Sequence, residues 1–245
     1  MKMKFIHKLL IVLAFCSVFS ACATQRVPKK EFIVDLDAPR VAIAEIEVQF
    51  EKLLAVAGLN KSKVAVFYYP TEDAVCLQYK YELFTYYQFW SSEGRDAFVN
   101  ALSQYIEDYN ERILARNGRK TLKNYGIEQG YIIWQLHRFA IKAKANTNYE
   151  LGYFFKERFP YFTVNQRETL YIDPIGSDNN RDTQAVTMYF TRAQAIELAT
   201  YFDQDYLSEH TSPDAVFESD NIDIDNYSEP GNEPINEPVK ESYNR

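Results

Sequence analysis

Apolar and aromatic side chains, interrupted only by Thr85, recur at every second position from Val75 to Phe89, and this period constrains the fold more than any other feature. Successive side chains of a β-strand point to opposite faces, so the alternation predicts a strand. The intervening positions are polar as far as Glu82 and largely aromatic from Phe84 onward. This change predicts that the far half of the strand is covered on both faces. One long strand over residues 75–89 is the simplest interpretation.

Three segments have the spacing of amphipathic helices, namely 39–57, 91–116 and 191–205. The first has apolar residues four positions apart, Pro39 in its first turn and Gly58 beyond its end. Short alternating runs from Val41 leave a strand open as the alternative there. A serine can cap the second segment, and the third begins with the capping box Thr191-x-x-Gln194.

Further strands are predicted at 64–69, 131–144, 149–158, 161–172 and 185–190, with a turn at 70–73 and breaks at 146–148 and 159–160. Strands followed by helices favour an α+β fold: an antiparallel sheet of five to six strands with about three helices packed on one face. Residues 85–109 and 187–206 share a strand, a hydroxyl cap and a helix, so a divergent duplication is an alternative account of the domain.

The chain is predicted to have four parts: a leader at 1–21, a tether at 22–36, one domain at 37–206 and a disordered acidic tail at 207–245. The tail is rich in Asp, Glu, Asn and Pro and lacks apolar periodicity. Such a composition buries too little surface to offset the entropy of ordering the chain.

The leader has basic residues from Lys2 to Lys8, an apolar stretch from Leu9, and the sequence Phe19-Ser20-Ala21-Cys22. It resembles a bacterial lipoprotein signal peptide. The resemblance implies that Cys22 becomes the first residue and carries diacylglycerol and a further acyl chain such as palmitate. It also implies a bilayer as partner and, because Ala23 is not Asp, the outer membrane in preference to the inner. A secretory leader cut after Ala21 is the alternative; the apolar stretch is too short for a membrane-spanning helix.

The sequence predicts no catalytic residues, no metal site and no cofactor. Beyond the leader and Cys22, Cys76 is the remaining cysteine, so no intramolecular disulfide is expected and Cys76 is interpreted as strand packing. His137 is interpreted as structural, and His210 is predicted to lie in the disordered tail. Acidic residues at 220–225 lack the spacing of a calcium loop. A carboxylate pair among Glu82, Glu150, Glu157 and Glu168 stays open, since spacing cannot identify one.

The formal net charge is −7, and no block of Lys and Arg is present. Nucleic acid is therefore not expected as a partner, because its recognition needs clustered cations.

The chain has 19 tyrosines, 17 phenylalanines and two tryptophans. Packing of helices on a sheet accounts for most of these, but an exposed strip could stack on a glycan or an envelope protein. Tyr86, Tyr87 and Trp90 are the candidate ligand-binding residues. The predicted function is a membrane-anchored cell-envelope lipoprotein with a non-enzymatic binding or scaffolding domain. A hydrolase of envelope polymers and a surface adhesin or antigen are the alternatives.

Overall fold

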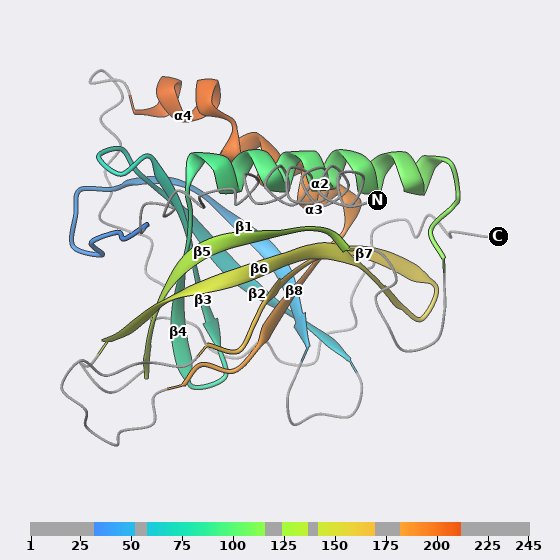
Figure 1. Cartoon of the computed structure of the whole chain (residues 1–245), viewed down its shortest axis with the longest axis horizontal. Coiled ribbons are helices and arrows are strands. Elements are labelled where there is room, and N and C mark those ends of the chain that lie inside the picture. The colour runs from blue at the N-terminus through green and yellow to red at the C-terminus, as the bar shows by residue number, and fades with distance from the viewer. Residues whose placement is uncertain (1–31, 52–57, 116–123, 137–141, 170–181, 212–245) are drawn as a thin grey trace, which may run out of the picture. The chain divides into compact units, whose positions relative to one another are not determined.

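The structure is a computed structural model that describes residues 32–51, 58–115, 124–136, 142–169 and 182–211. Its eight strands are β1 (Val41–Glu51), β2 (Leu59–Tyr69), β3 (Ala74–Tyr81), β4 (Phe84–Trp90), β5 (Asn124–Leu136), β6 (Lys142–Lys156), β7 (Phe159–Gln166) and β8 (Val186–Phe190). Each strand pairs antiparallel with the next, and β8 also pairs with β1. The sheet therefore closes into a barrel, as Figure 1 shows.

The predicted α+β fold is wrong, because the sheet has eight strands and closes on itself instead of presenting one face to a layer of helices. In a barrel every strand has two neighbours, so β1 and β8 are paired with each other instead of forming two separate sheet edges. The sequence pattern identifies strands one at a time and does not reveal that the last strand returns to the first. Closure is a property of the whole chain.

The predicted helix at 39–57 is also wrong, because its described part forms β1. Ile46, Val48 and Phe50 face the barrel interior, and Glu45 and Glu47 face outward, where they pair with lysines of β2. A step of four residues keeps side chains on one face of a helix and equally on one face of a strand. The four-residue spacing of Ile46 and Phe50 therefore could not distinguish the two. Residues 52–57 lie outside the described residues.

The long strand predicted at 75–89 is instead a hairpin of β3 and β4 joined at Glu82 and Leu83. Glu82 has φ 54°, in the left-handed region that a tight turn uses. A two-residue turn changes which alternate residues face inward. Inward positions are odd-numbered in β3 and even-numbered in β4, so the expected phase fails after the turn.

Both breaks predicted in the following region are wrong as placed. Residues 146–148 lie within β6, where they pair with β5. Pro160 pairs with Phe155 at the start of β7, a position at which a strand tolerates proline, and the turn itself is at 157–158. The turn predicted at 70–73 is confirmed, and β8 confirms the strand predicted at 185–190 to within one residue.

The two helices predicted after strands are confirmed as α2 (Ser92–Asn110) and α3 (Arg192–Phe202). The Ser91 hydroxyl accepts from Gly94 N, and the Thr191–Gln194 capping box is formed. Since strands alternate in direction, α2 after β4 and α3 after β8 leave from the same end of the barrel, where Figure 1 draws them packed together. Within the described ranges, no helix is both long and apolar enough to cross a lipid bilayer.

A third helix, α4 (Gln204–His210), lies where the disordered tail is predicted to begin. Leu207 is fully buried in the core, and Asp203 caps the helix through Tyr206 N. The start of the tail is therefore predicted too early. Residues 212–245 lie outside the described residues.

The interior of the barrel at the helix end is packed with aromatic rings. Trp90 of β4 lies 4.5 Å from Tyr149 and 5.4 Å from Phe202 of α3, measured between ring centroids. Phe98 of α2 meets Phe162 of β7 edge to face at 5.4 Å. Helices and barrel therefore share one hydrophobic core, which closes this end.

A second hydrophobic cluster lies on the outer face of β2 to β5 and is covered by the segment at 32–38. Phe32, Val34, Leu36 and Ala38 alternate along this segment and pack on the cluster. The Arg40 guanidinium lies 4.3 Å from the centre of the Phe67 ring. The segment, most of which the sequence analysis assigns to the tether, is thus part of the folded domain.

Gly130 of β5 is predicted to be essential for interior packing. An added Cβ would lie 2.0 Å from Cε2 of Tyr149, whose hydroxyl donates to the carbonyl oxygens of Phe89 and Tyr131. Gly130→Ala should therefore lower the free energy of unfolding by about 2–4 kcal/mol, measured by denaturant titration. Gly126→Ala on the same strand is the matched control, because nothing lies within 4 Å of its Cβ. Equal stability of the two variants would contradict this account of the core.

Candidate functional site

The barrel interior contains a chain of hydrogen bonds that runs between strands far apart in the sequence. The Tyr79 hydroxyl donates to Gln166 Oε1 at 3.3 Å, and Gln166 Nε2 donates to Thr183 Oγ1 at 3.5 Å. The Thr183 hydroxyl in turn donates to the Tyr86 hydroxyl at 3.2 Å. The rings of Tyr79 and Tyr86 stack with centroids 5.4 Å apart. These four side chains satisfy one another inside the barrel.

Two further polar side chains inside the barrel have no such partner among the residues that the structure describes. Gln88 of β4 is 0 % exposed, and neither its Nε2 nor its Oε1 has a hydrogen-bond partner. Trp90, two residues further along the same face, is 1 % exposed, and its indole Nε1 is also unpartnered. A buried polar group without a partner is costly and rare in folded proteins. This pair is the candidate functional site.

The surroundings of Gln88 explain why its amide is unsatisfied. The strand register places Leu77 of β3 and Ile132 of β5 directly beside it, and both side chains are apolar. Burial raises the pKa of Tyr79 well above its usual value and also raises the pKa of Tyr86, so both tyrosines stay neutral. The interior around Gln88 is therefore uncharged at neutral pH.

The three predicted ligand-binding residues are all buried. Tyr86 and Trp90 point into the barrel, whereas Tyr87 lies on the outer face beneath the 32–38 segment. They do not form an exposed strip. Trp90 and Tyr86 flank Gln88 on the inner face of β4, while Tyr87 is separated from them by the sheet. Ligand binding by these three residues stays a prediction, and of the three, Tyr86 and Trp90 face the barrel interior.

The sequence analysis missed Gln88, although a signal was available. Gln88 interrupts the aromatic run 86–90, and both faces of the strand are buried there. In such a run a glutamine needs a partner. The two-residue turn at 82–83, which decides that Gln88 faces inward, could not be recognised from the alternation.

The other residues singled out in the sequence do not converge on a site. Cys22 and His137 lie outside the described residues. Cys76 is fully buried on the outer face of β3, and burial raises the pKa of its thiol, which fits the predicted packing role. His210, instead of lying in a disordered tail, stacks on Tyr206 in α4 with ring centroids 4.0 Å apart. The described part of the chain contains no group of three potential metal ligands.

Three of the four glutamates considered as a carboxylate pair, Glu82, Glu150 and Glu157, lie apart or are already engaged. Glu82 is in the β3–β4 turn and Glu157 in the β6–β7 turn, and these two turns are at opposite ends of an up-and-down barrel. Glu150 of β6 is ion-paired with Arg167 and accepts from Asn165. Glu82 and Glu157 therefore cannot act together on one bond.

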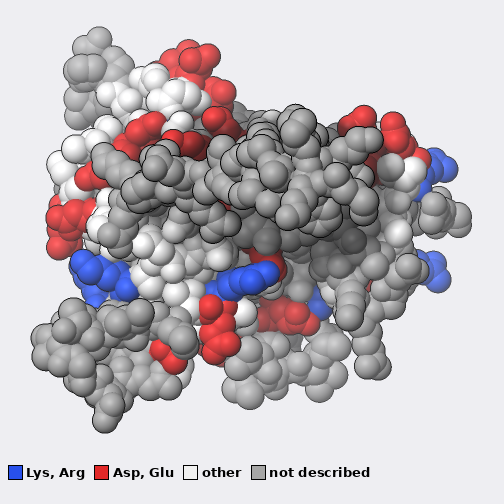
Figure 2. Space-filling model, viewed as in Figure 1, with Lys and Arg blue, Asp and Glu red and all other residues white. Residues whose placement is uncertain are grey.

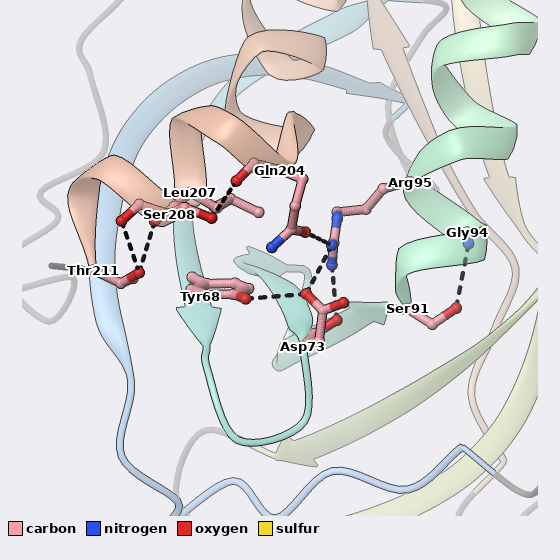
Figure 3. Close-up of polar contacts among 9 residues, drawn as sticks. All are labelled: Tyr68, Asp73, Ser91, Gly94, Arg95, Gln204, Leu207, Ser208 and Thr211. Atoms are coloured by element: carbon pink, nitrogen blue, oxygen red, sulfur yellow. Dashed lines mark hydrogen bonds and ion pairs between the residues drawn. The ribbon is translucent and has the colours of Figure 1, made fainter.

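The buried cation Arg95 has a structural role. Its guanidinium donates to the carbonyl oxygen and to Oδ1 of Asp73, both at 2.8 Å, and to Oε1 of Gln204 at 2.6 Å. Tyr68 donates to the same Asp73 carboxylate at 3.0 Å. Figure 3 shows that these contacts join the β2–β3 turn, the first turn of α2 and the start of α4. Its hydrogen bonds to protein groups satisfy this cation, so it fixes the helices and is not offered to a ligand.

The two buried glutamines should respond oppositely to the same substitution. In protein freed of ligand, Gln88→Met should raise the free energy of unfolding by about 1 kcal/mol, because it removes an amide without partners. Gln166→Met should lower it by about 1–3 kcal/mol, because Tyr79 and Thr183 lose their partner. Denaturant titration measures both. Destabilisation by Gln88→Met would show that its amide is satisfied in the folded protein.

Comparison with known proteins identifies a family but not an activity. Residues 27–209 match the family described as "Uncharacterised Treponema protein". No curated protein and no solved structure matches the chain. The matched region contains the 32–38 segment, all eight strands, α2, α3 and most of α4. The chain therefore belongs to this family of uncharacterised Treponema proteins.

Proposed function

We propose that this protein is a lipid-anchored protein of the cell envelope whose barrel binds a small molecule without transforming it. The observation that carries the proposal is the unpartnered amide of Gln88 beside the unpartnered indole N–H of Trp90, both buried inside the barrel. An eight-stranded barrel has an interior of a size that side chains fill or that holds one small ligand. Binding residues commonly lower the stability of the free protein, as an unsatisfied amide does.

Binding is favoured over catalysis by the character of the groups that face Gln88. Amide and indole groups do not ionise near neutral pH, and the raised pKa values of Tyr79 and Tyr86 remove them as bases. General acid–base catalysis needs a group that gains and loses a proton near the working pH. The site is built to donate and accept hydrogen bonds.

The anchor part of the proposal is supported by the sequence around Cys22 and by the position at which the fold begins. Phe32 packs on the barrel, and ten residues of extended chain would place Cys22 at most about 35 Å from it. An acylated Cys22 would keep the barrel near a membrane surface. Two acyl chains would make the attachment stable, since each buried methylene contributes about 0.8 kcal/mol. The outer membrane is the membrane we propose.

The surface charge favours a partner other than nucleic acid. In Figure 2, red acidic atoms lie along the upper part of the view, where Figure 1 draws the helices, and also at the left edge and in the lower middle, while blue basic atoms form small separate groups. Helix acids include Glu93, Asp96, Glu107, Glu197 and Asp205. Phosphate backbones would be repelled by such a surface. A neutral small molecule would not be repelled by it.

Acylation at Cys22 is tested by expressing the full chain in a bacterial host with labelled palmitate. The label should enter the protein, which should require detergent for extraction from membranes; Cys22→Ser should abolish both, because serine cannot form the thioether. Cys76→Ala is the matched control and should keep the label, since the Cys76 thiol is fully buried. An unlabelled protein with an N-terminus at Ala23 would refute the anchor.

Binding is tested by comparing melting temperatures of the same protein before and after removal of any natural ligand. Full chain purified from envelopes in mild detergent should melt several degrees higher than the same chain unfolded in guanidinium, dialysed and refolded, because a ligand stabilises only the folded state. Circular dichroism confirms that refolding is complete. Adding back the dialysed small-molecule fraction should restore the difference. Identical melting curves before and after refolding would argue against a bound ligand.

A further inference from the structure

Gln88 and Trp90 offer the barrel interior three hydrogen-bonding groups in a fixed order. Gln88 Nε2 and Trp90 Nε1 are donors, and Gln88 Oε1 is an acceptor. Their neighbours in the register, Leu77, Ile132 and Val75, are apolar and cannot satisfy them. The nearby polar chain from Tyr79 to Tyr86 is already bonded within itself. A matching molecule must therefore bring one donor and at least one acceptor.

We infer that this site binds a small, flat, uncharged molecule with an adjacent carbonyl and N–H, the edge presented by a cyclic amide. The carbonyl would accept from Gln88 Nε2, and the ligand N–H would donate to Gln88 Oε1, which forms a pair of parallel hydrogen bonds. The Trp90 indole N–H would donate to the second lone pair of the carbonyl or to another acceptor on the ring. This inference rests on the proposed binding function and names the ligand class.

The charge and shape of the interior support this class. No charged side chain flanks Gln88 in the register or two residues away on its strand, where Tyr86 and Trp90 lie. A charged ligand would lose its hydration there without gaining a counter-ion. Aromatic rings form part of the wall, which favours a flat ring.

Two inward-facing residues of β6, the second strand from Gln88, have short side chains. Ala145 of β6 pairs with Ile132 of β5, which itself pairs with Gln88. Ala143 of β6 pairs with Trp134. A ligand held by Gln88 would face these short side chains, whereas the space beside Gly130 is filled by the Tyr149 ring.

The probe that tests the inference is 2-pyrrolidinone, a five-membered cyclic amide, added to refolded full chain in detergent. The chain has two tryptophans, so labelling tryptophan with ¹⁵N gives two indole N–H signals, and Trp134→Phe assigns them. The Trp90 signal should shift saturably, with a dissociation constant of about 1 mM for a ligand of this size. The Trp134 signal should shift less.

Variants and analogues distinguish recognition by Gln88 from weak nonspecific binding. Gln88→Met should weaken binding about tenfold, because two hydrogen bonds are lost. Gln78→Met is the matched control: Gln78 lies on β3 opposite Tyr87, on the outer face, and its substitution should leave binding unchanged. Cyclopentanone, which lacks the N–H, should bind more weakly, and the pyrrolidinium cation should not bind.

The outcomes separate this inference from the proposed function. The inference is overturned if the lactam produces no saturable shift or if Gln88→Met binds as well as the parent. It is also overturned if, with the lactam present, the Trp90 N–H shows nuclear Overhauser effects to water and none to the lactam. If the lactam fails but the purified protein still loses stability on refolding, the ligand class is wrong and the binding function stands. If both experiments fail, the barrel is not a binding domain.

Discussion

The pairing of β8 with β1 converts a row of antiparallel strands into a closed barrel. The direct register is short, with Gln49 opposite Tyr189 and Phe50 opposite Met188. Side chains reinforce it. Glu51 is ion-paired with Lys156 at 2.6 Å and accepts from the Tyr189 hydroxyl at 3.0 Å, and the hydrogen bond from Lys156 holds the pKa of Glu51 below its usual value. Without this seam, β1 and β8 would be open edges.

Closure also determines what the interior can do. Once the sheet is closed, inward-facing side chains are removed from water, and each polar group among them must find a partner inside. Tyr79, Tyr86, Gln166 and Thr183 do so by bonding to one another, whereas the Gln88 amide and the Trp90 indole do not. The same enclosure that makes these groups costly would make hydrogen bonds to a ligand strong. Burial of the Gln88 amide and the Trp90 indole therefore accounts both for the lower stability of the free protein and for its proposed capacity to bind a ligand.

Segments outside the barrel are fixed by contacts of two kinds. The 32–38 segment is held by hydrophobic packing on the outer face, next to the cation–π contact of Arg40 with Phe67. The α4 helix is held by burial of Leu207 and by the hydrogen bonds of Arg95 to Asp73 and Gln204. The first contact holds residues 32–38 on the barrel, and the second joins α4 to the β2–β3 turn. Each segment is held by the surface on which it packs.

Local structure could be predicted from the amino-acid sequence wherever a specific side chain completes a local hydrogen bond or turn. The Ser91 cap, the Thr191–Gln194 capping box and the turn at 70–73 all involve residues within four positions of one another, and all three are confirmed. The alternation in 32–38 was equally local but too short to be recognised. The absence of a block of Lys and Arg argued against nucleic acid as a partner.

The fold and the candidate site depend on contacts between strands that are far apart in the sequence. Spacings of four residues fit both a strand and a helix, so β1 was identified by its pairing with β2 and not by its pattern. The turn at 82–83 reversed the facing of β4, which placed Gln88 and Trp90 inside the barrel and Tyr87 outside. Whether a buried amide is satisfied depends on which strands surround it. Those neighbours are set by closure of the whole sheet, a long-range constraint that no window of the sequence contains.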